Sequence, residues 1–232
     1  MPLNILLPII FLIVSFAGHA KAQSTADQQM LARATPYLGQ LKDTLARVWP
    51  EASVASGQYV AAQIEKESLW NPKAEACIPK PTCHLEHGVG FGQFTKTPKM
   101  NVFEEVKLMH PDLRGWSWDD RHNPTLQLIA VSVMDRSLFK RCQPLMSNEW
   151  GSFACTLSSY NGGFGGFSAD RRLCSNTSGC NPRVWSGNIE VTSLKAKTNL
   201  NGYRQSAYTI NRTYVRTILT ERNVKYRNFF QE

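Results

Sequence analysis

The chain lacks several features that would assign it to a common class of protein. Beyond residues 1–22 no apolar run approaches the roughly 20 residues that a membrane span needs. It has no G-x-S-x-G motif, no glycine-rich loop followed by G-K-[ST], no dinucleotide-binding fingerprint and no internal repeat. The 26 basic residues outnumber the 18 acidic ones, but they form no run that would indicate a nucleic acid partner. These absences argue against nucleotide-binding enzymes, nucleic-acid-binding proteins and hydrolases with that serine motif.

The first 22 residues are expected to be a targeting segment. Ile5 to Ala17 is a run of 13 largely apolar residues, and Ala20-Lys21-Ala22 has the small-x-small pattern of a cleavage site. We therefore expect export to the periplasm or the cell-wall side of the membrane, with cleavage after Ala22. The alternative is an uncleaved, releasable anchor that contacts the membrane transiently. Residues 23–34 are expected to be loose, and residues 35–232 to form one domain.

Helical patterns dominate this domain, so the predicted fold class is mainly α. Thr35-Pro36 is typical of a helix start, with Thr as the cap and Pro in the first turn. Leu126 to Met134 is apolar nearly all round, which predicts a buried central helix beginning at Asn123-Pro124. Trp150 to Tyr160 predicts another helix, closed by Asn161-Gly162-Gly163. Phe164 to Asn199, rich in Gly, Ser, Asn and Arg, is expected to be loop.

Six cysteines in an exported chain predict three disulfides. Any of fifteen pairings is formally possible. Short loops favour Cys77–Cys83 and Cys174–Cys180, leaving Cys142–Cys155. The rival interpretation is a metal site at Cys77, Cys83, His84 and His87, but their spacing fits none of the usual zinc patterns, so no metal is expected.

The stretch Gln63 to Phe94 contains the most informative carboxylate. Val60, Ile64 and Glu67 fall at i, i+4 and i+7, on one apolar helical face. Glu65 is two residues away, so we expect it to point away from the core. A carboxyl group in apolar surroundings has a raised pKa and can act as a general acid near neutral pH.

The end of this helix is also readable from the sequence. Asn71 precedes Pro72, and the residue before a proline resists helical geometry. The helix should therefore stop just after Glu67. This places the carboxyl group at a helix end, facing the glycine-rich segment Gly88 to Phe94.

Four segments, in order, resemble the lytic transglycosylases of the soluble-enzyme type. E-S-L-W-N-P-K-A from Glu67 is similar to that family's E-S-x-x-N-P-x-A, and G-V-G-F-G-Q-F from Gly88 is similar to G-x-x-G-L-M-Q. Ser159 to Gly163 resembles A-Y-N-x-G, and Asn211 to Arg216 resembles the terminal E-T-R-x-Y-V-x-R. The chain departs from the pattern in a longer insert, Cys77 to Glu86, and in Gly92, where the family commonly has Met.

The resemblance implies a lysozyme-like single domain in which the glycine-rich segment forms the groove floor. It implies cleavage of the MurNAc–GlcNAc bond of peptidoglycan with Glu67 as the catalytic residue, leaving 1,6-anhydro-MurNAc ends without metal or cofactor. The implied substrate-binding residues are Ser68, Gln93, Phe94, Tyr160, Asn161 and Tyr214. Tyr160 is expected to hold the catalytic carboxyl group. From the residues alone, Tyr160 and Tyr214 could equally belong to the core, and Asn161 could be a helix cap.

Two other functions stay open at this point. A hydrolase similar to goose-type lysozyme would want a second carboxylate, and Asp119 and Asp120 are the only clustered candidates. Trp116 and Trp118 beside them are expected to anchor a loop to the core. The other alternative is a non-catalytic wall-binding or secretion-accessory protein. The formal net charge of +8 favours an anionic partner such as a cell wall, and we expect a monomer, from a bacterium or from a phage that lyses one.

Overall fold

The computed structural model describes residues 24–98, 100–197 and 205–231, and its fold is mainly helical, as predicted. The expected targeting segment, residues 1–22, lies outside the described residues. The longer helices are α1 (Thr25–Val48), α2 (Val54–Ser68), α4 (Pro124–Cys142), α5 (Glu149–Gly162), α6 (Phe164–Ser175) and α7 (Ala207–Arg216). The shorter helical segments are α3 (Val102–Lys107), η1 (Pro111–Leu113), η2 (Gln143–Leu145), η3 (Trp185–Ile189), η4 (Thr217–Arg222), η5 (Asn223–Tyr226) and α8 (Arg227–Phe230).

One small antiparallel sheet accompanies the helices, with strand order β1-β2-β3. Its strands are β1 (Glu75–Ile78), β2 (Glu86–Val89) and β3 (Phe94–Thr95). Cys77 pairs with His87 across β1 and β2, and Val89 pairs with Phe94 across β2 and β3. The insert noted in the sequence is therefore the tip of the β1–β2 hairpin, and the glycine-rich segment is the turn between β2 and β3.

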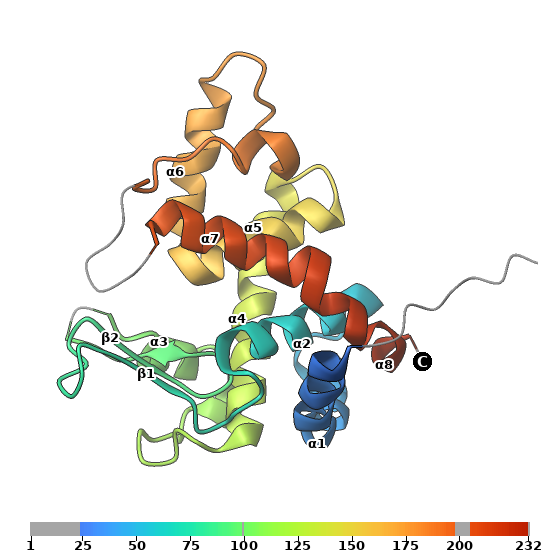
Figure 1. Cartoon of the computed structure of the whole chain (residues 1–232), viewed down its shortest axis with the longest axis vertical. Coiled ribbons are helices and arrows are strands. Elements are labelled where there is room, and N and C mark those ends of the chain that lie inside the picture. The colour runs from blue at the N-terminus through green and yellow to red at the C-terminus, as the bar shows by residue number, and fades with distance from the viewer. Residues whose placement is uncertain (1–23, 99, 198–204, 232) are drawn as a thin grey trace, which may run out of the picture.

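The central helix predicted from the apolar run is α4, which passes through the middle of the molecule (Figure 1). The Asn123 side chain accepts hydrogen bonds from the backbone N–H groups of Thr125 and Leu126, as the cap signal predicts. The apolar side chains of this helix that are fully buried include Leu128, Ala130 and Val131. A helix buried on most sides fixes the positions of the helices packed around it.

The expectation of a loose segment at residues 23–34 is wrong, because α1 begins at Thr25. Ser24 caps the helix by accepting a hydrogen bond from the Asp27 N–H at 3.2 Å. Pro36 then lies inside the helix rather than at its start. The carbonyl that its missing N–H would have reached belongs to Ala32, an exposed residue, where solvent can satisfy it.

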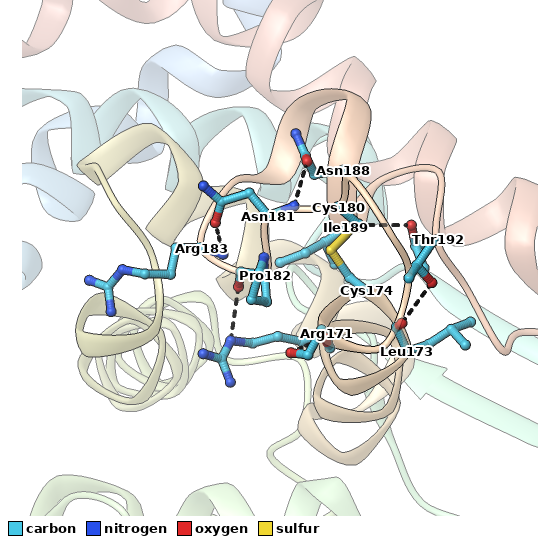
Figure 2. Close-up of a disulfide and its surroundings, with 12 residues drawn as sticks. Arg171, Leu173, Cys174, Cys180, Asn181, Pro182, Arg183, Asn188, Ile189 and Thr192 are labelled. Atoms are coloured by element: carbon cyan, nitrogen blue, oxygen red, sulfur yellow. Dashed lines mark hydrogen bonds between the residues drawn. A yellow bond between two sulfur atoms is a disulfide. The ribbon is translucent and has the colours of Figure 1, made fainter.

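The expectation of a continuous loop from Phe164 is also wrong, because its first part forms α6. Phe167, Asp170 and Cys174 lie one turn apart and are buried on a single face, and this pattern is diluted in the sequence by glycine and arginine. Beyond α6, the Cys174–Cys180 disulfide pins the irregular segment back to the helix (Figure 2). Within that segment the backbone N–H of Asn181 donates to the Asn188 side chain at 2.8 Å.

The three predicted disulfides are confirmed: Cys77–Cys83, Cys142–Cys155 and Cys174–Cys180. All six cysteines of the chain are used by these bridges. Such a set fits folding in an oxidising environment. In the described part of the chain, no helix is both long and apolar enough to cross a membrane.

Candidate functional site

Glu67 lies at the end of α2, as the Asn71-Pro72 signal predicts. The helix ends at Ser68, and the next two residues, Leu69 and Trp70, both adopt left-handed backbone conformations with φ of 53° and 59°. Such conformations are costly for residues other than glycine and persist where the surroundings fix them. Here the buried Trp70 indole donates a hydrogen bond to the Tyr226 hydroxyl at 2.8 Å. The chain therefore turns sharply directly after the catalytic candidate.

The Glu67 carboxyl group is held close to half-protonated at neutral pH. The residue keeps part of its surface open, yet burial raises its pKa to about 7. The Tyr214 hydroxyl donates to Glu67 Oε1 at 2.6 Å, which lowers the pKa, as does the charge of Lys66, while nearby Glu86 raises it. No cation forms an ion pair with Glu67 in the described part of the chain.

Tyr160 does not bond Glu67, so the positioning contact expected of it belongs to Tyr214. The Tyr160 hydroxyl instead donates to the Gly92 carbonyl at 2.8 Å. Burial, followed by the charge of Glu67, raises the pKa of Tyr160 well above its ordinary value, so the hydroxyl stays neutral. Tyr160 thus fastens the end of α5 to the glycine-rich turn.

The close approach of that turn explains why glycine occupies position 92. A Cβ atom at Gly92 would lie 2.6 Å from the Tyr160 hydroxyl and 2.5 Å from the Phe94 ring, closer than any side chain can come. The Gln93 side chain closes the same turn by donating to the Gly90 carbonyl at 2.9 Å. Gln93 therefore acts within the turn, in a backbone conformation with φ of 48°.

Gln127 holds the turn from the other side, which the sequence reading missed. It interrupts the apolar run of α4 and is fully buried. Its Oε1 accepts the Phe91 N–H at 2.9 Å, while its Nε2 donates to the carbonyls of Pro72 and Arg121. The sequence did contain a signal for this role, because Gln127 is a polar residue within an apolar run.

Two of the expected substrate-binding side chains are buried within the fold. The Ser68 hydroxyl donates to the Ile64 carbonyl one turn back at 2.9 Å. Phe94 is 1% exposed and packs edge-on against Trp116. Neither side chain presents a free group to a ligand in this arrangement.

Asn161 is exposed and lines an open groove of about 440 Å³. The groove runs between β2, the end of α5 and the start of α7. Its lining residues are Leu85, Glu86, Thr95, Met100, Asn161, Gly162, Lys195, Ala207, Ile210 and Asn211. Asn211 donates to the Ser158 carbonyl at 2.9 Å and to Asn161 at 3.2 Å, so α7 holds the groove-facing end of α5. Glu67 is not among these lining residues, but Glu86 is, and its charge acts on Glu67.

Glu65 does not point away from the core, which corrects the expectation from helical geometry. It is 2% exposed, accepts hydrogen bonds from Tyr226 at 2.7 Å and Lys225 at 3.0 Å, and is paired with Arg222. Glu65 and Glu67 meet different partners, but other segments pack against both faces of α2. The segment η4–η5 packs over the face that carries Glu65.

Asp119 and Asp120 are exposed residues of the loop before α4 and do not line the groove. The Ser117 hydroxyl donates to the Asp120 carboxylate at 2.9 Å. Trp116 is 1% exposed, so the prediction that it anchors this loop to the core is confirmed. The carboxylate that does reach the groove is Glu86, which the sequence reading did not select.

Another buried carboxyl group, Asp135 on α4, was also missed. It is 2% exposed, and burial raises its pKa to about 8. Gln63 Nε2 donates to its Oδ1 at 3.1 Å. The periodicity of α4 predicted only core at this position, and the signal was a lone acid directly after an apolar run.

Comparison with known proteins finds no family model that matches the chain and no matching curated protein. Among the described residues, no group of three or more His, Cys, Asp or Glu side chains is arranged to hold a metal ion. The fold and the site together define a mainly helical, disulfide-bonded protein. The candidate site is the Glu67 carboxyl group, whose pKa burial raises to about 7, together with the groove that Glu86 lines.

Proposed function

We propose that this protein is a peptidoglycan lytic transglycosylase of the exported, lysozyme-like kind. The observation that carries the proposal is the Glu67 carboxyl group, whose pKa is raised to about 7 beside a groove of about 440 Å³. The resemblance of four ordered segments to that family supports the same assignment. The positive net charge suits an anionic wall, on which the enzyme would act as a monomer without a cofactor.

The reaction needs one group that is first an acid and then a base. Protonated Glu67 gives its proton to the bridging oxygen as the bond from that oxygen to the MurNAc anomeric carbon breaks. The MurNAc C6 hydroxyl then attacks the same carbon, and the Glu67 carboxylate takes the hydroxyl proton. No water is consumed, and Glu67 ends protonated, ready for the next cycle. A pKa near the working pH serves both steps.

The hydrogen bond from Tyr214 makes the two carboxylate oxygens of Glu67 different from each other. Tyr214 holds Oε1 at 2.6 Å. We assign the proton transfers to Oε2, which the Tyr214 hydroxyl does not occupy. Since the Tyr214 hydroxyl is a donor, it also stabilises the carboxylate that forms after the first proton transfer.

Product analysis tests this proposal directly. Purified peptidoglycan digested by the wild type should release fragments that end in 1,6-anhydro-MurNAc, each one water lighter than a hydrolysis product by mass spectrometry. Glu67→Gln should release none above background. Glu105→Gln, at an exposed carboxylate of α3, is the matched control and should cleave like the wild type. Absence of any cleavage by the wild type would reject the proposal.

Glu86 keeps hydrolysis as a second candidate function. It is a half-buried carboxylate in the groove lining, close enough to Glu67 to raise its pKa. A hydrolase would use such a group to activate water or to support the transition state. Reducing MurNAc ends from the wild type, lost in Glu86→Gln, would favour this candidate and would leave Glu67 as the acid.

A further inference from the structure

Beneath Glu67 lies a polar cluster that the proposed mechanism does not use. Asp135 of α4 and Gln63 of α2 are 2% and 1% exposed, and the Gln63 amide donates to Asp135 Oδ1 at 3.1 Å. Asp135 Oδ2 and Gln63 Oε1 have no hydrogen-bond partner among the described residues. Buried carboxyl groups are rare in protein cores unless they are paired, so this one needs an explanation.

The surroundings of Asp135 favour its neutral form. A cavity of about 10 Å³ adjoins the pair, near the lower limit for one water molecule. Its walls are mostly apolar, formed by Trp49, Tyr59, Val60, Phe153, Thr156 and Leu157 around the two polar side chains. No Lys, Arg or His of the described residues forms an ion pair with Asp135.

The cluster connects upward to the candidate catalytic group. Gln63 precedes Glu67 by four residues on α2, so it lies one turn beneath it. Gln63 also acts on the Tyr160 hydroxyl, which reaches from α5 to the glycine-rich turn. The titratable groups that face Asp135 are Glu67 and Tyr59 from α2, Tyr160 from α5 and Tyr214 from α7. Burial raises the pKa of all three tyrosines, so they are neutral. Among the described residues, the charge that faces Asp135 is thus that of Glu67 alone.

Resting on the proposed function, we propose that Asp135 is a positioning residue of this site. Asp135 stays uncharged in the core and holds the Gln63 amide in place by accepting its hydrogen bond. Asp135 and Gln63 together form a polar but neutral floor beneath Glu67. An apolar residue there would leave the Gln63 amide without its partner. A charged one would place a second anion under the catalytic carboxyl group, at the moment when that group must itself become an anion.

Three variants separate positioning from packing. Asp135→Leu removes the anchor and should lower kcat roughly ten- to a hundredfold with little change in KM, because the groove is untouched. Asp135→Asn keeps an acceptor for Gln63 and should retain activity at pH 6. Ser132→Ala, a buried change one turn away on α4, is the matched control and should behave like the wild type.

The pH profile gives a readout that a packing role would not move. Above about pH 8 the logarithm of kcat of the wild type should fall by two units per pH unit, because both Glu67 and Asp135 have then ionised. We call this a two-proton slope. Asp135→Asn should keep a slope of one proton throughout. Full activity of folded Asp135→Leu, or a two-proton slope in Asp135→Asn, would overturn the proposal.

Carboxyl carbon NMR tests the same coupling without relying on an Asp135 variant or on activity. In Glu67→Gln the like charge is gone, so the midpoint of Asp135 should fall by roughly half a pH unit or more. An identical midpoint in the wild type and in Glu67→Gln overturns the proposal. If the wild type fails to cleave peptidoglycan but the midpoint shifts, the proposed function is rejected and the coupling of the two carboxyl groups stands.

Discussion

Buried carboxyl groups occur in two contrasting surroundings in this molecule. Glu65 and Asp170 each share two cations: Arg222 and Lys225 for the first, Lys195 and Arg212 for the second. In the described part of the chain Glu67 and Asp135 are paired with no cation, and burial raises the pKa of both. The first pair is suited to holding chain segments together through ion pairs, and the second to exchanging protons.

The comparison is sharpest at the end of α2, where Glu65 and Glu67 are two residues apart. The C-terminal segment brings its cations to Glu65 only, and α7 brings a neutral hydroxyl to Glu67. Chemically identical side chains on one helix turn thus acquire different roles from the partners that arrive. Exposure alone would not separate them, since Glu65 is the more deeply buried of the two.

Glu67→Gln should produce the largest effect and should affect chemistry rather than stability. Losing a positioned general acid typically costs about 10²–10⁴ in rate, and here the same group is also the base, so we expect a loss at or beyond the upper value. The melting temperature should not fall, because no ion pair is broken. Rate measurements on soluble glycan fragments and a thermal melt of the same sample check both parts.

Glu65→Gln should show the opposite pattern. It leaves Arg222 and Lys225 without their shared anion, and breaking a buried pair costs about 3–5 kcal/mol of the free energy of unfolding. Activity per folded molecule should stay close to that of the wild type. A variant of Glu65 that melts normally but is inactive would erase the contrast between the two carboxylates.

The dependence of stability on pH should separate Asp135 from the ion-paired acids. Its folded pKa of about 8 lies far above the ordinary value of 3.8, so the folded state holds a proton that the unfolded state releases. Stability must therefore fall as pH rises from about 4 to about 8. Asp135→Asn removes this loss and should be more stable at pH 9 by on the order of a few kcal/mol. Denaturant titrations at pH 5 and pH 9 measure the free energy of unfolding of both proteins. An equal fall between these pH values in the wild type and in Asp135→Asn would contradict the prediction.

Carboxylates that are paired with cations should make stability depend on pH in the opposite direction. The Asp170 pKa is lowered overall, since Lys195 and Arg212 outweigh the opposing effect of burial. Its stabilising contribution is present above its unfolded pKa and is lost as pH falls through the folded value. Greatest stability is thus expected at mildly acidic pH, between the two effects.

Tyr214→Phe should have a smaller effect. It removes the hydroxyl that bonds Glu67 and lowers its pKa, so the pKa should rise and the alkaline limb of the rate profile should move to higher pH. We expect a loss of roughly ten- to a hundredfold at the optimum, since one hydrogen bond to a charged group contributes about 1.5–3 kcal/mol. An unchanged pH profile would assign Tyr214 to the core alone.

Tyr160→Phe should have the smallest effect. It removes the hydrogen bond to the Gly92 carbonyl, which is worth about 1 kcal/mol, and leaves the ring in place. We expect a modest fall in activity at nearly constant melting temperature. A sharp fall in melting temperature with unchanged activity per folded molecule would show that this residue serves the fold only.

Local signals in the sequence were sufficient for several parts of this structure. Asn71-Pro72 located the end of α2, the apolar run from Leu126 located α4, and short loops identified the disulfides. What escaped prediction depends on contacts between distant residues. Arg222 reaches Glu65 across 157 positions, and Gln63 meets Asp135 across 72. No spacing rule reports which side of a helix a remote segment will cover.

The two wrong expectations, a loose segment where α1 begins and a loop where α6 lies, have a different physical origin. Thr35-Pro36 has the chemistry of a helix start, but Ser24 offers a cap further upstream, and the packing of Ala34, Leu38 and Leu41 favours the longer helix. Local propensity is a weak preference that burial of an apolar face readily overrides. The same reasoning applies to α6, where buried Phe167 outweighs the neighbouring glycines.

The Cys142–Cys155 bridge has a consequence for how the molecule opens and closes. It joins α4, which carries Asp135, to α5, which ends beside Tyr160. Neither helix can separate from the other without unfolding broadly, so their amide hydrogens should exchange with solvent slowly and as one cooperative unit. The β1–β2 hairpin lies outside that constraint. The polar floor beneath Glu67 should therefore be the last part of the site to open.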